Sequence, residues 1–297
     1  MEDIVFDKYL YLMLIPGLLF ILVFNYIPMG GIIIAFKKYN IFKGIWGSPW
    51  VGFKNFESVF TSPSFLNVLR NTLIISFYKL IFSMPLTIII SLLLNEIKNK
   101  YFKRSVQTVL YFPYFISWVV ISGIMLNILS PSYGIAGDIY RLFGMEPVNL
   151  MASSEHFRAL LVISDAWKGV GAGTIIYLAA ISVISPDLYE SAIVDGANRW
   201  RQMWHITIPG MRRIIVLSLI LSIGFIMSAG FDQIIVMQNF MVQSVSDIFD
   251  TFVYRAGLLE RSYSFSTALG LFKGVVTAIL ILGTEFLAKR IGEEGML

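Results

Sequence analysis

The sequence predicts an all-α integral membrane protein with six transmembrane helices. Its 297 residues are 57% hydrophobic and only 14% charged, whereas soluble domains carry about 25% charged residues. The chain also contains six apolar runs of the length that a bilayer requires, roughly 20 residues each. These runs are continuous rather than alternating, which argues against the strands of a membrane β-barrel. We expect one transmembrane domain covering residues 1–297.

The six predicted spans differ in the charges that they carry. The first and third are uncharged, and the first is too long for a cleaved signal peptide and lacks its small-residue cleavage site. Charges occur in the second span (Lys79), the fourth (Asp165 and Lys168), the fifth (Asp232) and the sixth. Asp165 and Lys168 are three residues apart and could pair on one helix face. The predicted spans are residues 9–36, 72–94, 106–129, 159–184, 214–236 and 267–287.

The loops indicate how the chain lies in the membrane. Cytoplasmic loops usually carry an excess of Lys and Arg, and such an excess is obtained when both termini are cytoplasmic. The first span taken alone indicates the opposite, because Lys37 and Lys38 follow it while only Lys8 precedes it. The outer loop 37–70 is rich in aromatic residues. We expect these to pack within the loop or form an interfacial belt, with partner docking or sugar stacking as the alternative.

Several function classes find no support in the sequence. There is no cysteine, and His156 and His205 are far apart, so we expect no metal site. No phosphate-binding loop and no hydrolase motif occurs. The glycines of residues 168–174 lie inside the fourth span and indicate close helix packing rather than a phosphate site. Scattered basic residues give nucleic-acid binding little support. We therefore expect no catalytic residue, no cofactor in this chain and no enzyme activity.

The segment 185–213, between the fourth and fifth spans, carries the strongest local pattern. Pro186 and Asp187 are typical of a helix start. Gly196 weakens a continuous helix by about 1 kcal/mol relative to alanine, so it predicts a bend between two short helices. Trp200 and Trp204 add an apolar face, and Pro209 is expected to end the segment. Such an amphipathic element suits a groove on another protein.

This pattern resembles the EAA motif of binding-protein-dependent ABC importer permeases. Glu190-Ser191-Ala192 and Asp195-Gly196-Ala197 are followed at the motif's spacing by Ile206 and Pro209, with Ser191 and Ile208 departing from the usual alanine and leucine. The resemblance implies an ABC type I importer permease fold, in which this loop is a cytoplasmic coupling helix that docks on an ATPase. The coupling residues that it implies are Glu190, Ala192, Asp195, Gly196, Ala197, Trp200, Trp204, Ile206 and Pro209.

The start and end of the chain resemble the polysaccharide-type (LplB-like) carbohydrate permeases, a group that includes the alginate importer. That resemblance implies import of oligosaccharides, such as those from alginate or pectin, across a bacterial plasma membrane. It also implies a second homologous permease, two ATPase subunits that bind ATP and magnesium, and an extracellular solute-binding protein.

Placing polar residues in lipid is energetically unfavourable, so those within the spans usually face protein or water. Asn127, Trp167, Asp232 and Gln233 are our candidates for a sugar path, because hydroxyls need hydrogen-bond partners and an aromatic ring offers stacking. The alternative is that such groups only fix helix packing, as we expect of Lys79 and Lys273. Two other classes stay open: an ion-gradient-driven secondary transporter, and an assembly protein without transport.

Overall fold

The computed structural model describes residues 8–290, and these residues form no β-strand beyond an isolated antiparallel bridge between Lys37 and Trp50. The chain divides into two compact units. Unit 1 comprises residues 1–65 and 252–274, and unit 2 comprises residues 66–251 and 275–297. Within the described part, 4 helices are long and apolar enough to cross a membrane, or up to 6 spans if each of two bent helix pairs counts as one. The predicted all-α membrane fold is thus confirmed.

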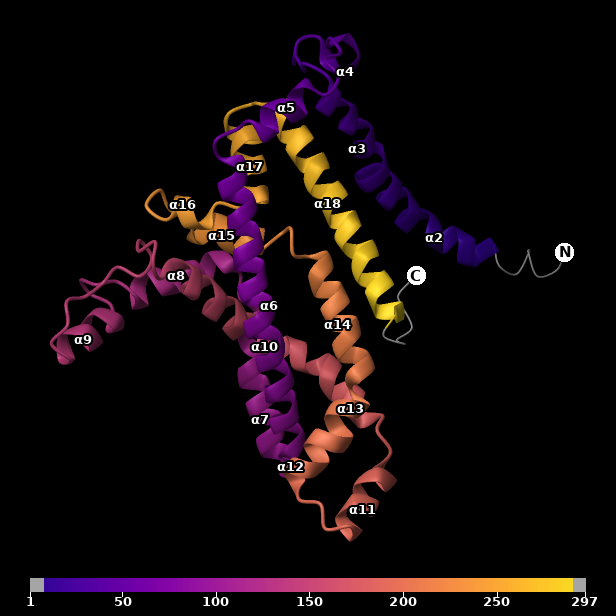
Figure 1. Cartoon of the computed structure of the whole chain (residues 1–297), viewed down its shortest axis with the longest axis vertical. Helices are drawn as coiled ribbons and strands as arrows, with labels where there is room; N and C mark the ends of the chain where they lie inside the picture. The colour runs from indigo at the N-terminus through magenta and orange to yellow at the C-terminus, as the bar shows by residue number, and fades with distance from the viewer. Residues whose placement is uncertain (1–7, 291–297) are drawn as a thin grey trace. The chain divides into compact units, whose positions relative to one another are not determined.

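Unit 1 begins with a helical run that contains the candidate span Leu10–Phe36, of which only 6% is buried. In Figure 1 this run is indigo. It is followed by a loop with two short helices. The helical elements are α2 (Lys8–Ile21), η1 (Leu22–Tyr26), α3 (Ile27–Met29), η2 (Gly30–Phe36), α4 (Gly44–Gly47), α5 (Lys54–Phe60), η5 (Arg255–Leu259) and the first part of α18 (Tyr263–Arg290).

The aromatic loop packs on the end of the first span. The Phe36 ring stacks on Trp50 with centroids 5.7 Å apart and meets Phe53 and Phe56 at 5.5 Å and 5.3 Å. Lys37 donates to the Ile45 carbonyl at 2.9 Å and closes the loop. The expected packing within this loop is therefore present.

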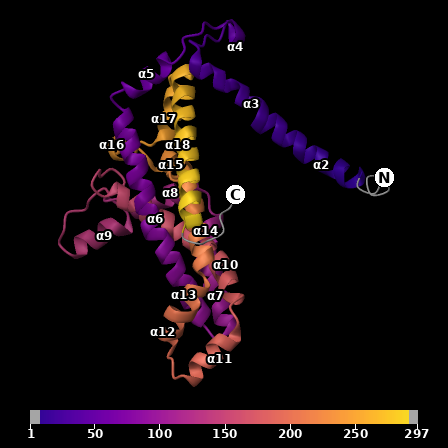
Figure 2. The ribbon, with the colours of Figure 1, turned by 45° about the vertical axis from the view of Figure 1, so that its right-hand side comes forward.

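Unit 2 holds most of the remaining helices, of which α6 and α10 are the longest. In Figures 1 and 2, α11 and α12 lie at one end of this unit, near α7 and α13. The elements are α6 (Phe65–Glu96), α7 (Lys100–Tyr111), η3 (Phe112–Phe115), α8 (Trp118–Ile128), α9 (Ile135–Leu142), α10 (Phe157–Ser182), α11 (Pro186–Val194), α12 (Arg199–Gln202), η4 (Met203–Thr207), α13 (Ile208–Gly210), α14 (Arg212–Gly224), α15 (Phe231–Met237), α16 (Gln243–Ser246) and α17 (Phe249–Tyr254), which continues into unit 1.

The glycines of α10 allow close packing, as their run predicted. A Cβ on Gly171 would collide with the Leu110 carbonyl of α7, and one on Gly173 would lie 2.9 Å from Cγ2 of Thr87 on α6. Small residues therefore let three helices meet. On the same unit a buried cluster of Leu92, Tyr177, Ile181 and Met211 joins α6, α10 and the start of α14.

Two predicted spans are interrupted rather than continuous. Residues 106–129 contain a 101° bend between η3 and α8, where Pro113 has no N–H and Ser117 caps the new helix. Residues 214–236 leave the helix after Gly224 and re-enter at Phe231. Ala229 and Gly230 there have positive φ angles of 48° and 85°. Hydropathy does not detect these breaks, because apolar residues occupy both sides of each one.

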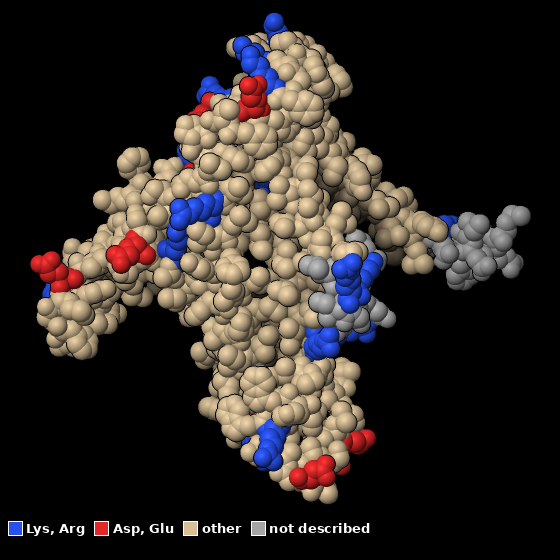
Figure 3. Space-filling model, viewed as in Figure 1, with Lys and Arg blue, Asp and Glu red and all other residues tan. Residues whose placement is uncertain are grey.

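The coupling segment also differs from a plain loop. Residues Arg199–Gly210 are helical and form a bent pair with Arg212–Gly224, at an angle of 58°. Charged side chains gather at the end of unit 2 that α11 and α12 form, while neighbouring surface is largely uncharged (Figure 3). This distribution fits a polar cap on an apolar bundle.

Candidate functional site

The coupling segment begins with a capped helix. The Ser185 hydroxyl accepts a hydrogen bond from the Asp187 N–H at 3.3 Å, and Pro186 occupies the first turn, where its missing N–H costs nothing. Asp187 places a negative charge near the positive end of the helix. The helix start predicted at Pro186 is confirmed.

Gly196 ends this helix in a left-handed turn. Its φ angle is +76°, a value that residues with a Cβ rarely adopt. Its N–H donates to the Ile193 carbonyl at 3.0 Å, and the next N–H, of Ala197, donates to Ala192 at 2.8 Å. These two bonds form a Schellman motif. The Asp-Gly-Ala sequence is thus a helix stop that aims α12 away from α11, as the predicted bend requires.

The second half of the segment is a helix with a π turn. Asn198 caps α12 by accepting from the Arg201 N–H at 2.9 Å, and η4 continues it into α13. Pro209 lies inside α13 rather than ending it, and the break falls at Met211. The expected stop at Pro209 is therefore displaced by two residues.

Side-chain bonds hold the two helices of the segment together. Tyr189 Oη and Thr207 Oγ1 are 3.0 Å apart, and Gln202 Nε2 donates to the Ala197 carbonyl at 2.9 Å. Arg199 pairs with Glu96 at the end of α6, with 3.1 Å between Nη1 and Oε2. These contacts connect the segment to a long helix of the same unit.

The predicted coupling residues divide into an exposed set and a set that lines a hollow. Trp200 and Trp204 are 65% and 63% exposed, and Glu190, Asp195, Gly196 and Pro209 are exposed as well. Ala192, Ala197 and Ile206 line a hollow of about 350 Å³ together with Arg201, Gln202 and His205. Exposed tryptophans on a rigid helix are typical of a protein interface.

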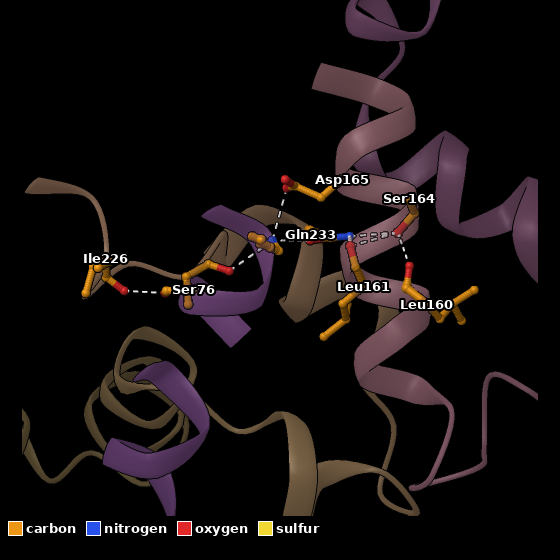
Figure 4. Close-up of polar contacts among 9 residues, drawn as sticks. Ser76, Leu160, Leu161, Ser164, Asp165, Ile226 and Gln233 are labelled. Carbon is orange, nitrogen blue, oxygen red and sulfur yellow. Dashed lines mark hydrogen bonds and ion pairs between the residues drawn. The ribbon is translucent and has the colours of Figure 1, made fainter. Parts of the chain in front are cut away.

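A second polar site lies among the helices of unit 2. Lys79 of α6 reaches Asp165 Oδ1 of α10 at 3.0 Å, the Ala229 carbonyl at 3.0 Å and Gln233 Oε1 of α15 at 2.5 Å. An ammonium group has three protons, so each one is used. The Gln233 amide in turn donates to Leu161 O and Ser164 Oγ, both at 2.8 Å (Figure 4). The network stabilises the break in the fifth span by bonding its Ala229 carbonyl.

The ion pair differs from the expected one. Asp165 pairs with Lys79, and Lys168 instead donates to the carbonyls of Pro113, Tyr114 and Ile116 at the bend in the third span. Lys168 takes these partners because a helix end leaves carbonyls without hydrogen-bond donors, and inside a bilayer no water is present to donate to them. Lys79 forms a pair, as expected.

A cavity of about 490 Å³ lies beside this network. Its wall is mainly apolar, but six of the lining residues carry hydroxyls. They belong to Ser76, Ser83, Thr87, Tyr177, Ser218 and Ser222, while Lys79, Asp165 and Phe225 complete the polar and aromatic lining. Ser83 Oγ is buried and has no hydrogen-bond partner among the described residues. An unpartnered buried hydroxyl costs about 1–3 kcal/mol.

The four predicted path residues do not gather around this cavity. Gln233 is 1% exposed and lies behind Lys79, while Asn127 is exposed and bonds to the Gly123 carbonyl at 2.8 Å. Trp167 is 53% exposed on the outside of α10, and Asp232 is exposed. None of the four is part of the cavity lining. Their role in a sugar path stays a prediction.

The cavity residues left a signal in the sequence that the prediction missed. Ser76, Lys79, Ser83 and Thr87 recur at steps of three or four residues on α6, and such residues share a helix face. Asp165, Gly169 and Gly173 do the same on α10. Stripes of small and hydroxyl-bearing residues on two spans therefore indicated the position of the cavity better than isolated polar residues did. Among the described residues, no group of three or more His, Cys, Asp or Glu side chains could hold a metal.

Together, the helices, the capped coupling segment and the cavity with its buried charges define a polytopic membrane protein with features of a transport subunit. Residues 83–293 match the family described as binding-protein-dependent transport system inner membrane component, and the chain belongs to this family. Among curated relatives, Protein LplB of Bacillus subtilis (strain 168) is 44% identical over 98% of this chain and 91% of its own length. The polygalacturonan/rhamnogalacturonan transport system permease protein YteP of the same organism is 45% identical over 98% of this chain and 90% of its own.

Solved structures agree with these relatives. A chain from the crystal structure of a bacterial ABC transporter involved in the import of the acidic polysaccharide alginate matches with a TM-score of 0.90 and 37% identity, over 98% of both chains. A chain from the bacterial alginate ABC transporter in complex with alginate pentasaccharide-bound periplasmic protein matches with a TM-score of 0.91 and 36% identity, over 99% of both. These findings confirm the predicted type I importer permease fold. They also confirm a membrane-embedded permease rather than an enzyme.

Proposed function

We propose that the chain is the transmembrane permease subunit of an ATP-driven oligosaccharide importer, coupled to a separate ATPase through residues 185–213. The observation that carries this proposal is the rigid coupling segment, with its left-handed Gly196 turn and its two exposed tryptophans. The relatives' names support sugar transport, and the family supports ABC-type import. They give no support to an ion-gradient-driven transporter.

The proposed partners follow from the same findings. A second homologous permease would complete the pathway, two ATPase subunits would bind ATP and magnesium, and an extracellular solute-binding protein would deliver the sugar. A relative solved with a sugar-bound periplasmic protein supports the last of these. The coupling segment then lies in the cytoplasm, and with it both termini, in a bacterial plasma membrane.

The mechanism is a two-state equilibrium that the ATPase biases through differential contacts. ATP binding closes the ATPase pair and moves α11 and α12, and the Arg199–Glu96 and Tyr189–Thr207 contacts pass that motion to the bundle. Of the predicted contacts, Glu190 provides a polar one and Trp200 and Trp204 fill the groove. The hydroxyl-lined cavity is the proposed sugar path, since oligosaccharides need many hydrogen-bond partners.

The substrates that we propose are breakdown products of acidic polysaccharides, such as alginate-derived or pectin-derived oligosaccharides. YteP is named for polygalacturonan and rhamnogalacturonan transport, and both solved relatives belong to alginate transporters. Stimulation of ATP hydrolysis by the binding protein loaded with each sugar would rank these candidates.

ATP hydrolysis in proteoliposomes tests the coupling role. The chain is reconstituted with the second permease, the ATPase and the binding protein, with and without oligosaccharide. We expect stimulation by the loaded binding protein, and loss of ATPase co-purification for Trp204→Ala. Trp46→Ala is the matched control, because Trp46 is also exposed, at 85%, but lies in unit 1. Equal ATPase retention by the two variants would refute the docking role of Trp204.

A further inference from the structure

The loop between the third and fourth spans carries a short helix, α9 (Ile135–Leu142), that exposes apolar side chains. Ile135, Ile139 and Leu142 share one face of this helix, because residues three or four apart lie one above the other. They are 63%, 50% and 81% exposed, and Phe143, directly after the helix, is exposed as well. We call these four residues the α9 strip. An exposed apolar patch of this kind marks a contact with a membrane or with another protein.

The turn before α9 fixes this helix against the end of α8. A Cβ on Gly134 would lie 2.5 Å from the carbonyl oxygens of Asn127 and Ile128, and one on Gly137 would lie 2.5 Å from that of Pro131. Side chains do not fit at these distances, so the backbone of α9 itself makes the contact. At 3.6 residues per turn, Gly137 lies on roughly the opposite side of the helix from the α9 strip. The contact therefore leaves the strip uncovered.

The end of α8 lies level with the ends of two other spans. Met125 and Leu129 pack against the buried cluster that contains Ile75 and Phe157. Phe157 is the first residue of α10, and Ile75 lies near the start of the predicted second span, 72–94. Because α9 is fixed to this end of α8, it begins at the edge of the membrane-spanning region. In Figures 1 and 2 it lies beyond α8 and away from α6 and α10.

The charged side chains of α9 are paired within their own segment. Arg141 Nη1 donates to Asp138 Oδ1 at 2.7 Å, and Nη2 donates to the carbonyls of Pro131 and Ser132 at 2.8 Å and 3.0 Å. The Asp138–Arg141 pair carries no net charge. An interface with another protein surrounds its apolar core with hydrogen bonds and polar groups, and these two side chains have already used theirs. Lipid chains need no such groups, so they suit the α9 strip better.

We propose that α9 lies in the membrane interface, with the α9 strip against lipid acyl chains and the Asp138–Arg141 pair among the headgroups. Amphipathic helices bind a bilayer in this way. The strip continues the apolar surface of α8, where Val120, Ile124 and Ile128 recur at steps of four and are exposed. Only the side of the membrane rests on the function proposed above. The loops at the two ends of α10 lie on opposite sides, so a cytoplasmic coupling segment places α9 at the outer surface.

Spin labels on single cysteines test this proposal, because the chain contains no cysteine of its own. Leu142→Cys reports on the α9 strip. Glu146→Cys is the matched control, since Glu146 is exposed in the same loop but lies outside the strip. The labelled chain is assembled with cysteine-free partner subunits in lipid nanodiscs, and the access of oxygen, which concentrates in lipid, is compared with that of a water-soluble nickel chelate. We expect the oxygen-to-nickel ratio to be several-fold higher at position 142 than at position 146.

The other outcomes overturn the proposal. Equal ratios at the two positions would mean that the strip is in water. Protection of the label at position 142 from both reagents would mean that a protein covers the strip, and repeating the measurement without the solute-binding protein shows whether that protein is the cover. Ile139→Cys gives the same reading one turn earlier if the first variant does not assemble. No reading needs sugar or ATP, so a failure of the importer function, seen as ATP hydrolysis that loaded binding protein does not stimulate, is recognised separately.

Discussion

Replacing Gly196 by valine should uncouple ATP hydrolysis from transport by removing the turn between α11 and α12. The φ angle of +76° is unfavourable for any residue with a Cβ, by about 1–2 kcal/mol. No heavy atom lies within 4 Å of the position that a Cβ would take, so the cost is conformational rather than steric. Two hydrogen bonds hold the turn, together about 2 kcal/mol at about 1 kcal/mol each. The strain in the valine variant is thus as large as the stabilisation from the two hydrogen bonds. The chain then loses most of its preference for the left-handed turn at this position.

The chain contains a closely matched control for this substitution. Gly144 has a φ angle of +67°, also with nothing within 4 Å of an added Cβ. It ends α9 with the same pair of bonds, from Gly144 to Arg141 at 3.0 Å and from Met145 to Tyr140 at 2.9 Å. Gly144→Val therefore carries the same backbone strain away from the coupling segment.

Sugar uptake and ATP hydrolysis are measured together in proteoliposomes. We expect Gly196→Val to lose uptake several-fold per ATP hydrolysed, and Gly196→Asn to lose less, because asparagine tolerates the left-handed region. Gly144→Val should transport normally. Normal uptake by Gly196→Val, or an equal loss in both valine variants, would refute the assignment of this turn as the coupling hinge.

Two further substitutions test the packing and the polar network of unit 2. Gly171→Ala should destabilise the protein by several kcal/mol or prevent assembly, because its Cβ would collide with the Leu110 carbonyl. Gly169→Ala is the control, since an added Cβ there meets open space and should be tolerated. Thermal unfolding in detergent distinguishes the two variants, and equal unfolding temperatures would contradict the close approach of Gly171 to Leu110. Gln233→Leu should lower stability by about 1–3 kcal/mol, because it takes an acceptor from buried Lys79; an unchanged unfolding temperature would mean that the network contributes nothing to stability.

Much of the structure of the coupling segment could be predicted from the sequence because the signals that determine it are local. A proline and an acid in the first turn and a glycine at the stop each act on neighbouring backbone groups, so Pro186, Asp187 and Gly196 indicate the first helix and its end without knowledge of the fold. The cavity was harder to predict. Its wall combines residues from α6, α10 and α14, and the sequence does not state which faces of these helices meet.

The sequence by itself determined that this protein is embedded in a membrane and that its helices lie roughly where apolar runs occur. It also determined that residues 185–213 form a bent helical element. These properties depend on composition and on neighbours within a few residues. Only the tertiary structure decided that Asp165 pairs with Lys79 rather than with Lys168, and that the third and fifth spans are interrupted. The physical reason is that buried polar groups take the partners that distant helices bring to them, and lipid offers no water as a substitute.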